Sequence, residues 1–252
     1  MNAWTGGQYS VYRVALAVVV AVHFARTGGG DGLAGLAATI PLALGVSDRI
    51  FAFIAAAMAA PSASPVLVAL LFVHGLAPGQ PYGSWEARGR PDPGGGWRMP
   101  RWHPFHWLGP GFVPPRRAAS PATLFYDGDC GLCHRAVRFV LAEDPEGRAF
   151  RFAPLASPAF AAALPAGERA ALPDSLVVRT PDGPVLVRTA GVREICDRLG
   201  GLWRVLALVS RALPERLLDR GYDAVARARK RIFAPPAEAC PRVPPDLRRR
   251  FD

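Results

Sequence analysis

The stretch LFYDGDCGLCH, residues 124–134, decides how the second half of this chain is expected to fold. Thr123 to Tyr126 is a short β-branched and aromatic run, which predicts a buried strand. After the second cysteine, apolar residues recur at helical spacing: Ala136, Val137, Phe139, Val140 and Leu141. The two cysteines therefore lie where a strand passes through a turn into a helix.

The position of the two cysteines favours thiol chemistry. The first backbone N–H groups of a helix have no partner within the helix, and together with the helix dipole they stabilise an anion such as a thiolate. In a Cys-x-x-Cys pair the first cysteine is typically the nucleophile, and the second resolves the mixed disulfide. We therefore predict that Cys130 attacks and Cys133 resolves.

Charge is distributed unevenly along the chain. The 252 residues include 30 Lys and Arg against 20 Asp and Glu, a net charge of +10. Within residues 1–85 the charged side chains are only Arg13, Arg26, Asp31, Asp48 and Arg49. In the second half the basic residues are dispersed among acids, and no nucleic-acid-binding motif accompanies them. The composition predicts two regions with different surroundings and no nucleic-acid partner.

Four apolar segments occupy the first region. They cover roughly residues 9–25, 33–46, 50–60 and 65–77. Each is shorter than the about 20 residues that span a bilayer comfortably, so a soluble helical bundle is the alternative. A soluble bundle needs polar outer faces, which these segments lack. The sequence predicts an α-helical, transmembrane region at residues 1–80, in contact with membrane lipid.

Pro, Gly, Trp and Arg dominate residues 81–121, where no helical or strand period survives. We interpret this segment as an interfacial loop followed by a linker. Its arginines predict that it lies on the cytoplasmic side of a membrane; they are Arg88, Arg90, Arg98 and Arg101. His103 and His106 have metal-like spacing, but no Cys or carboxylate lies nearby, which indicates a packed loop rather than a metal site.

Residues 122–252 return to a globular pattern. Beyond the cysteine helix we expect a strand at 149–155, a β-hairpin from strands 175–179 and 184–188 around the turn 181–183, and helices at 190–199, 203–212 and 217–233. This order, β-α-β and then β-β-α, predicts an α/β domain of the thioredoxin-like class. Thr189 is the expected N-cap of the first of those helices. Pro173 is either a cis-proline facing the cysteines or an ordinary loop proline.

Residues close to the cysteines offer supporting roles. Asp127 and Asp129 are expected to make the turn and cap the cysteine helix, with Asp129 favoured as the cap. The alternative is that one of them exchanges a proton with a thiol. His134, if protonated, would stabilise a thiolate, and otherwise is a solvated side chain.

Other classes of protein share parts of this pattern. Cys130, Cys133 and His134 complete a c-type haem attachment motif, but no later His or Met offers a second axial ligand. A zinc site would also need Cys196 or Cys240. Cys196 lies on an apolar helix face and is expected to be a core residue, whereas Cys240 is a candidate third thiol, a metal ligand or an exposed side chain. We expect no metal and no cofactor, and keep a non-catalytic membrane-associated interaction protein as an alternative.

Residues 126–133, Tyr-Asp-Gly-Asp-Cys-Gly-Leu-Cys, resemble the hallmark Tyr-Asp-Gly-x-Cys-x-x-Cys of the DCC family of thiol-disulfide oxidoreductases. The likeness runs from about Ala122 to the C-terminus, and its further parts are Phe152–Leu155, Leu199–Trp203, Tyr222–Arg231 and Cys240-Pro241. The resemblance implies a thioredoxin-like enzyme that acts on a protein or small-molecule thiol or disulfide, with Tyr126 and Asp127 as part of its motif.

The first half is similar to the beginning of the transmembrane domain shared with vitamin K-dependent gamma-carboxylase. Trp4–Ser10, Pro81–Trp85 and Gly94–Pro100 carry this likeness. The further membrane helices expected after Pro100 are missing, so carboxylase activity is not carried over. Together the two resemblances imply a membrane-tethered thiol-disulfide oxidoreductase with its redox domain, residues 122–252, on the cytoplasmic side.

Overall fold

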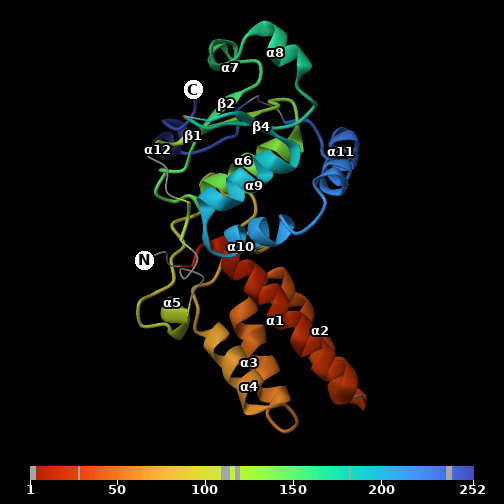
Figure 1. Ribbon diagram of the computed structural model, residues 1–252. Helices are drawn as coiled ribbons and strands as arrows, with labels where there is room; N and C mark the ends of the chain where they lie inside the picture. Colours follow the sequence, from red (N-terminus) through yellow and green to blue (C-terminus); the bar gives the residue numbers. More distant parts are fainter. Residues whose placement is uncertain (1–3, 28, 109–113, 117–119, 182, 237–239) are drawn as a thin grey trace. The chain divides into compact units, whose positions relative to one another are not determined.

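The structure is a computed structural model, and it describes residues 4–27, 29–108, 114–116, 120–181, 183–236 and 240–252 (Figure 1). The chain forms two compact units, one of Met1–Arg90 and Gly94–Gly111 and the other of Pro91–Pro93 and Phe112–Asp252. Residues 81–90 and 94–108, which we expected to be loop and linker, therefore belong to the N-terminal unit.

Helices make up the N-terminal unit, and the four apolar segments coincide with the first four. The helices are α1 (Gly6–Thr27), α2 (Gly29–Leu44), α3 (Asp48–Ala59), α4 (Pro65–Gly75) and the short α5 (Pro104–Leu108). The start of α4 shows why these segments become helical. Ser64 accepts a hydrogen bond from the N–H of Leu67, and Pro65 occupies the first helical position.

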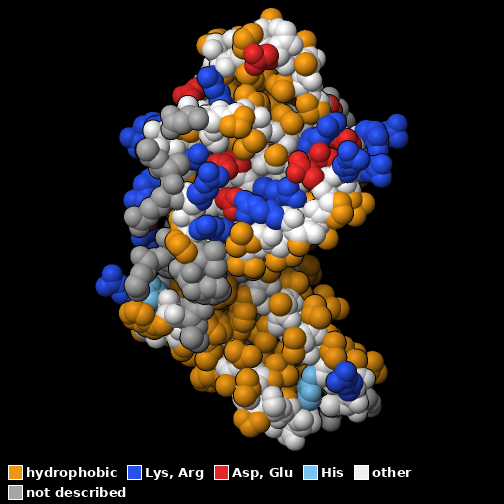
Figure 2. All heavy atoms as spheres, viewed as in Figure 1, with side chains coloured by type: hydrophobic (Ala, Val, Ile, Leu, Met, Phe, Trp, Pro, Cys, Tyr) orange, Lys and Arg blue, Asp and Glu red, His pale blue; other side chains and the backbone are white. Residues whose placement is uncertain are grey.

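The outward faces of these helices are also apolar. Along α1 the exposed side chains include Val11, Val14, Val18, Val19 and Val22, and hydrophobic side chains cover much of this unit in Figure 2. Among the described residues, α1, with 22 residues, is the helix whose length and composition allow it to cross a membrane. Helices α2, α3 and α4 have 16, 12 and 11 residues.

A polar group is buried inside this apolar unit. The hydroxyl of Tyr9 lies 2.7 Å from Nδ1 of His74. Asp48 Oδ2 lies 3.6 Å from His74 Nε2 and 3.6 Å from Arg13 Nη1. Since a buried charge is tolerated only beside a partner, these contacts tie α1, α3 and α4 together.

His103 and His106 do not meet at a common point. His103 Nε2 donates to the carbonyl oxygen of Val73 at 2.9 Å, and His106 Nδ1 donates to that of Met99 at 3.2 Å. Each ring therefore fixes backbone. The prediction that this segment is a loop is wrong at residues 104–108, which form α5.

A four-stranded mixed sheet forms the centre of the C-terminal unit. Its strands are β1 (Ala122–Tyr126), β2 (Phe150–Pro154), β3 (Val177–Arg179) and β4 (Val185–Val187), in the spatial order β2-β1-β3-β4. β1 is parallel to β2 and antiparallel to β3, and β3 is antiparallel to β4. The predicted strand and hairpin are confirmed, although residue 182 of the hairpin turn lies outside the described residues.

The helices of this unit cover both faces of the sheet (Figure 1). They are α6 (Gly131–Glu143), α7 (Pro158–Ala163), α8 (Ala166–Ala171), α9 (Arg188–Leu199), α10 (Gly201–Ser210), α11 (Glu215–Ile232) and α12 (Pro245–Arg248). Because side chains alternate along a strand, Leu124 and Tyr126 pack with α6 and α9 on one face, and Phe125 packs with Phe160 of α7 on the other. The unit is a mixed α/β fold.

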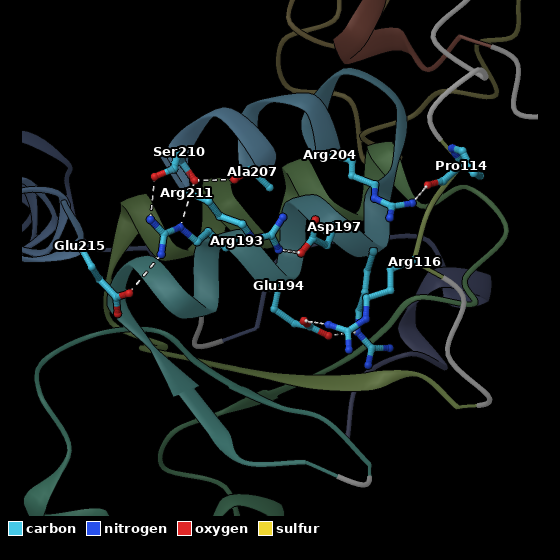
Figure 3. A network of polar contacts seen from close by, with 11 residues as sticks. Pro114, Arg116, Arg193, Glu194, Asp197, Arg204, Ala207, Ser210, Arg211 and Glu215 are labelled. Carbon is cyan, nitrogen blue, oxygen red and sulfur yellow. Dashed lines mark hydrogen bonds and ion pairs between the residues drawn. The ribbon is translucent and has the colours of Figure 1, made fainter. Parts of the chain in front are cut away.

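Polar contacts join α9, α10 and α11 (Figure 3). Arg193 of α9 donates to Ser210 Oγ at 3.0 Å and to Glu215 at 3.2 Å. The predicted capping of α9 by Thr189 is wrong, because the helix begins earlier, with Val187 as its N-cap. The N–H of Thr189 instead donates to Asp219 of α11 at 3.2 Å, a cap supplied by another helix.

Candidate active site

The cysteine pair lies at the start of α6. Cys130 occupies the N-cap position in an extended conformation, and the N–H of Cys133 donates to Cys130 Sγ at 3.2 Å. The sulfur thus takes the place of the usual capping oxygen, at the positive end of the helix dipole. The prediction that Asp129 caps this helix is wrong because Cys130 itself holds the cap position.

Asp127 and His134 hold the turn before the cysteines. Asp127 Oδ1 accepts a hydrogen bond from the N–H of Asp129 at 3.0 Å, and His134 Nε2 donates to the carbonyl oxygen of Gly128 at 3.0 Å. The ring of His134 is buried edge-on against Tyr126, with 5.8 Å between the ring centroids. His134 is therefore not a solvated side chain, and the nitrogen that could bind a haem iron is engaged in the turn.

Arg229 of α11 is a charged member of this site that the sequence interpretation did not single out. Its side chain is 3% exposed, and Nη2 lies 3.3 Å from Asp127 Oδ2 and 2.6 Å from Asp174 Oδ1. Its Nε has no hydrogen-bond partner within the described part of the chain. Burial alone would lower the pKa of Arg229, but the neighbouring sulfurs of Cys133 and Cys130 and the two carboxylates raise it above the usual value. The guanidinium therefore stays charged beside the cysteines.

The environment of Cys133 keeps it protonated at neutral pH. Burial raises the pKa of its thiol to about 12, the Cys130 sulfur adds to the rise, and Arg229 opposes it. A sulfur in this position is therefore a thiol and not a thiolate until it is activated.

Both motif sulfurs are covered, since Cys130 is 2% and Cys133 6% exposed. Part of the cover comes from the backbone after α11. A Cβ on Gly131, between the cysteines, would clash with the carbonyl oxygen of Ala234. Glycine is therefore required at this position of the motif as long as the two segments are in contact.

The remaining predicted site residues have distinct places. Pro173 precedes Asp174, so its loop reaches Arg229. The Leu172–Pro173 peptide is trans, so of the two alternatives for Pro173 the ordinary loop proline holds. Cys196 and Cys240 are half-buried free thiols. No group of three or more His, Cys, Asp or Glu side chains that could hold a metal ion occurs in the described ranges.

Comparisons with known proteins address the same region. A family model described as DCC1-like thiol-disulfide oxidoreductase matches residues 124–235. The uncharacterized protein YuxK of Bacillus subtilis (strain 168) is 31% identical over 132 residues, which is 51% of this chain and 91% of that protein. The chain belongs to the DCC1-like thiol-disulfide oxidoreductase family. No solved structure matches it.

Membership of the DCC1-like family supports a redox role and confirms the family resemblance noted at residues 126–133. The matched region begins in β1 and ends just after α11, so it includes both motif cysteines and Arg229. The comparisons do not support the resemblance of the N-terminal unit to the gamma-carboxylase transmembrane domain, which stays a prediction.

In the DCC1-like domain, Cys133 is expected to resist alkylation well above neutral pH. Its thiolate forms in the folded, reduced protein only as the pH rises towards a pKa of about 12, against an ordinary value of 9.0 in the unfolded chain. The stability contributed by the neutral thiol is therefore complete below pH 9 and is lost as the pH rises through 12. Iodoacetamide labelling at pH 9, read by peptide mass spectrometry, should be much slower in the native chain than in urea. Equal rates in the two states would contradict this expectation.

Proposed function

We propose that the C-terminal unit is a thioredoxin-like domain that catalyses thiol–disulfide exchange through Cys130 and Cys133. The strand order β2-β1-β3-β4, with a cysteine pair at the helix that follows β1, supports the fold. The observation that carries the function is the sulfur of Cys130 at the N-cap of α6, accepting the N–H of Cys133. A thiolate at this place gains a hydrogen bond and the helix dipole, whereas Cys133 stays protonated.

Exchange proceeds by two displacements. The Cys130 thiolate attacks one sulfur of the substrate disulfide, forms a mixed disulfide with it, and releases the other sulfur as a thiolate that takes up a proton. Cys133 then gives up its proton and attacks the sulfur of Cys130, which releases the second substrate thiol. The substrate gains two electrons and the motif becomes a Cys130–Cys133 disulfide; the reverse steps oxidise a substrate dithiol.

Arg229 stabilises the negative charge that appears on these sulfurs. Its guanidinium is charged, buried and held by Asp127 and Asp174, and its unpaired Nε is a donor that a thiolate can accept from. An opposite charge within about 4–6 Å favours an ionised group by about 1–3 pH units. Asp127 and Asp174 thus orient the Arg229 guanidinium, and their charges are offset by it instead of acting against the thiolate.

Replacement of Arg229 by glutamine is expected to slow exchange by roughly tenfold, because the sulfur anion loses its cation. Arg229→Lys keeps the charge and should recover most of the rate. The measurement is the single-turnover reduction of a glutathionylated peptide by the reduced full chain, beside the Tm of each variant. A Lys variant as slow as the Gln variant, at unchanged Tm, would show that charge is not the cause.

The test of the proposed function uses the reduced full chain in nanodiscs with oxidised glutathione at pH 7.5. We expect a Cys130–Cys133 disulfide in the peptide map, together with release of glutathione thiols, and return to the dithiol when a thiol reductant is added. The proposal fails if both cysteines stay reduced under conditions in which the urea-unfolded chain oxidises.

We further propose that α1 tethers the protein to a membrane, with the redox domain on the cytoplasmic side. The length and apolar outer face of α1 support the tether, and the arginines of residues 88–101 support the orientation. Resistance to extraction by alkaline carbonate tests the tether. Protection of a C-terminal tag from protease in intact spheroplasts tests the cytoplasmic orientation. Extraction by carbonate would refute the tether, and cleavage of the tag would refute the orientation.

A further inference from the structure

The segment that follows α11 lies along the first half of α6. We define the C-terminal strap as residues 233–236 and 240–243. At one end the strap is anchored by Ala234, whose carbonyl oxygen lies against Gly131. At the other end the carbonyl oxygen of Arg242 accepts a hydrogen bond from Arg138 Nη1 at 3.1 Å. Gly131 and Arg138 are seven residues apart, which is about 10 Å along a helix.

In the sequence, Cys240 lies between these two anchors. The next anchoring side chain, Val243, packs on the buried cluster that contains Cys130 and Cys133. The strap therefore holds a half-buried thiol close to the start of α6, where the motif sulfurs lie.

Tyr126 and Cys240 influence each other, because the Cys240 thiol is among the groups that shift the pKa of Tyr126. The ring of Tyr126 is completely buried in the cluster of the motif cysteines, and its hydroxyl makes no hydrogen bond of good geometry with any described residue. Burial, and after it the Cys240 thiol, raises the pKa of Tyr126 above its usual range. A hydroxyl that stays neutral is a hydrogen-bond donor, so Tyr126 offers the sulfur of Cys240 a buried donor.

The protonated state of Cys133 makes it a slow resolving thiol, so a second thiol could resolve the mixed disulfide in its place. Attack on a disulfide needs a thiolate, and burial holds Cys133 as a thiol. Cys130 is almost fully buried, so the Cys240 thiol of the C-terminal strap reaches it more readily than a thiol from solvent.

We propose that Cys240 is a second resolving thiol, which attacks Cys130 while Cys130 carries a mixed disulfide with substrate. This inference rests on the proposed exchange at Cys130. Cys240 gives up its proton, the bond between Cys130 and the substrate sulfur breaks as a Cys130–Cys240 disulfide forms, and the substrate leaves as a thiolate that takes the proton. No oxidant beyond the substrate disulfide is needed. Attack by Cys133 on Cys130 then frees Cys240 and leaves the Cys130–Cys133 disulfide.

The test uses the Cys133→Ser full chain in nanodiscs with oxidised glutathione. We expect glutathione to add to Cys130 and then to leave as a Cys130–Cys240 disulfide forms. Release of glutathione should be at least about tenfold faster than in a Cys133→Ser/Cys240→Ser chain, which lacks both proposed resolving thiols. The matched control is Cys133→Ser/Cys196→Ser, which should behave as Cys133→Ser alone. Peptide mass spectrometry follows both the adduct and the disulfide.

The outcomes separate this inference from the proposed function. Glutathione retained on Cys130 in the Cys133→Ser chain, with Cys240 reduced, would overturn the role of Cys240 and leave attack by Cys130 intact. Failure of Cys130 to gain glutathione in every variant would refute both. The Tm of each variant verifies that it is folded, and Cys240→Ala repeats the comparison without a new hydroxyl.

Discussion

Replacement of Cys130 by serine is expected to lower disulfide-exchange turnover by about three orders of magnitude or more, the scale seen when an enzyme loses its nucleophile. The hydroxyl that replaces the thiol does not ionise near neutral pH, and it cannot form a disulfide. The fold should be kept, because serine is a favourable N-cap residue and its Oγ can accept the Cys133 N–H in place of the sulfur. Turnover is measured with dye-labelled glutathione disulfide and the full chain in detergent, beside the Tm.

The matched control for this variant is Cys196→Ser. Cys196 is also a half-buried free thiol, but it lies in α9 and outside the cluster that contains the motif cysteines. Its replacement should leave turnover unchanged. Wild-type turnover in the Cys130→Ser chain would place the chemistry at another residue and contradict the assignment of the nucleophile.

The parts of the fold that the sequence predicts are those with a local cause. The strand ending at Tyr126, the helix beginning after Cys130 and the hairpin before α9 each follow from short patterns of apolar residues and turn residues. The first four helices of the N-terminal unit follow in the same way from apolar runs. The approach of Tyr9, Arg13 and His74 to Asp48 has no such local signal, because it depends on how the helices pack.

The helix caps show the limit of local preference. Asp129 and Thr189 are favourable capping residues, yet Cys130 holds one cap position and Asp219 of α11 serves the other helix. A preference scale ranks residues by type. It contains no information about a side chain that arrives from a distant helix or about a sulfur that replaces the capping oxygen.

Arg229 was missed for a related reason. It is separated from Asp127 by 102 positions in the sequence, so no motif spacing connects them. A weaker signal was present in α11, where Tyr222 and Arg229 lie two helical turns apart on one face. Both reach the loop before β3, since the Tyr222 hydroxyl accepts the N–H of Leu176 at 3.1 Å and Arg229 pairs with Asp174. The spacing of Tyr222 and Arg229 thus indicates a face of α11 that points inward. It contains no information that the cysteines lie next to that face.

The end of the chain is held by a buried ion pair with Asp144, the C-cap of α6, and by backbone contacts with β2. Asp144 Oδ2 lies 2.6 Å from Arg250 Nη2, with the two side chains 8% and 7% exposed. The N–H of Phe152 donates to the carbonyl oxygen of Arg250 at 2.9 Å, and Phe251 forms a parallel bridge with Phe152. Asp144 also accepts backbone N–H groups at the start of β2, from Arg148, Ala149 and Phe150.

Asp144→Ala is therefore expected to destabilise the C-terminal unit by about 3–5 kcal/mol, the usual loss when one partner of a buried pair is removed. Burial raises the pKa of Asp144, while Arg250 and the backbone N–H groups oppose the rise. The cost of removing both charges from water therefore offsets much of the attraction between Asp144 and Arg250 in the native protein. The loss in the variant comes from the buried charge of Arg250, which loses its counter-ion although it keeps the carbonyl oxygens of Asp144 and Phe150 as acceptors. The three N–H groups that the carboxylate accepts also lose this acceptor. Hydrogen exchange of β2 peptides in the full chain measures the free energy of opening.

Glu146→Ala provides the control, two positions further along the chain. Glu146 also pairs with an arginine, Arg148, but their side chains are 59% and 81% exposed, so its removal should change stability by less than about 0.5 kcal/mol. Asp144→Asn, which keeps one acceptor oxygen, should fall between the two. Equal losses for Asp144→Ala and Glu146→Ala would mean that the chain end is held by its backbone bridge to Phe152 and not by the buried charge.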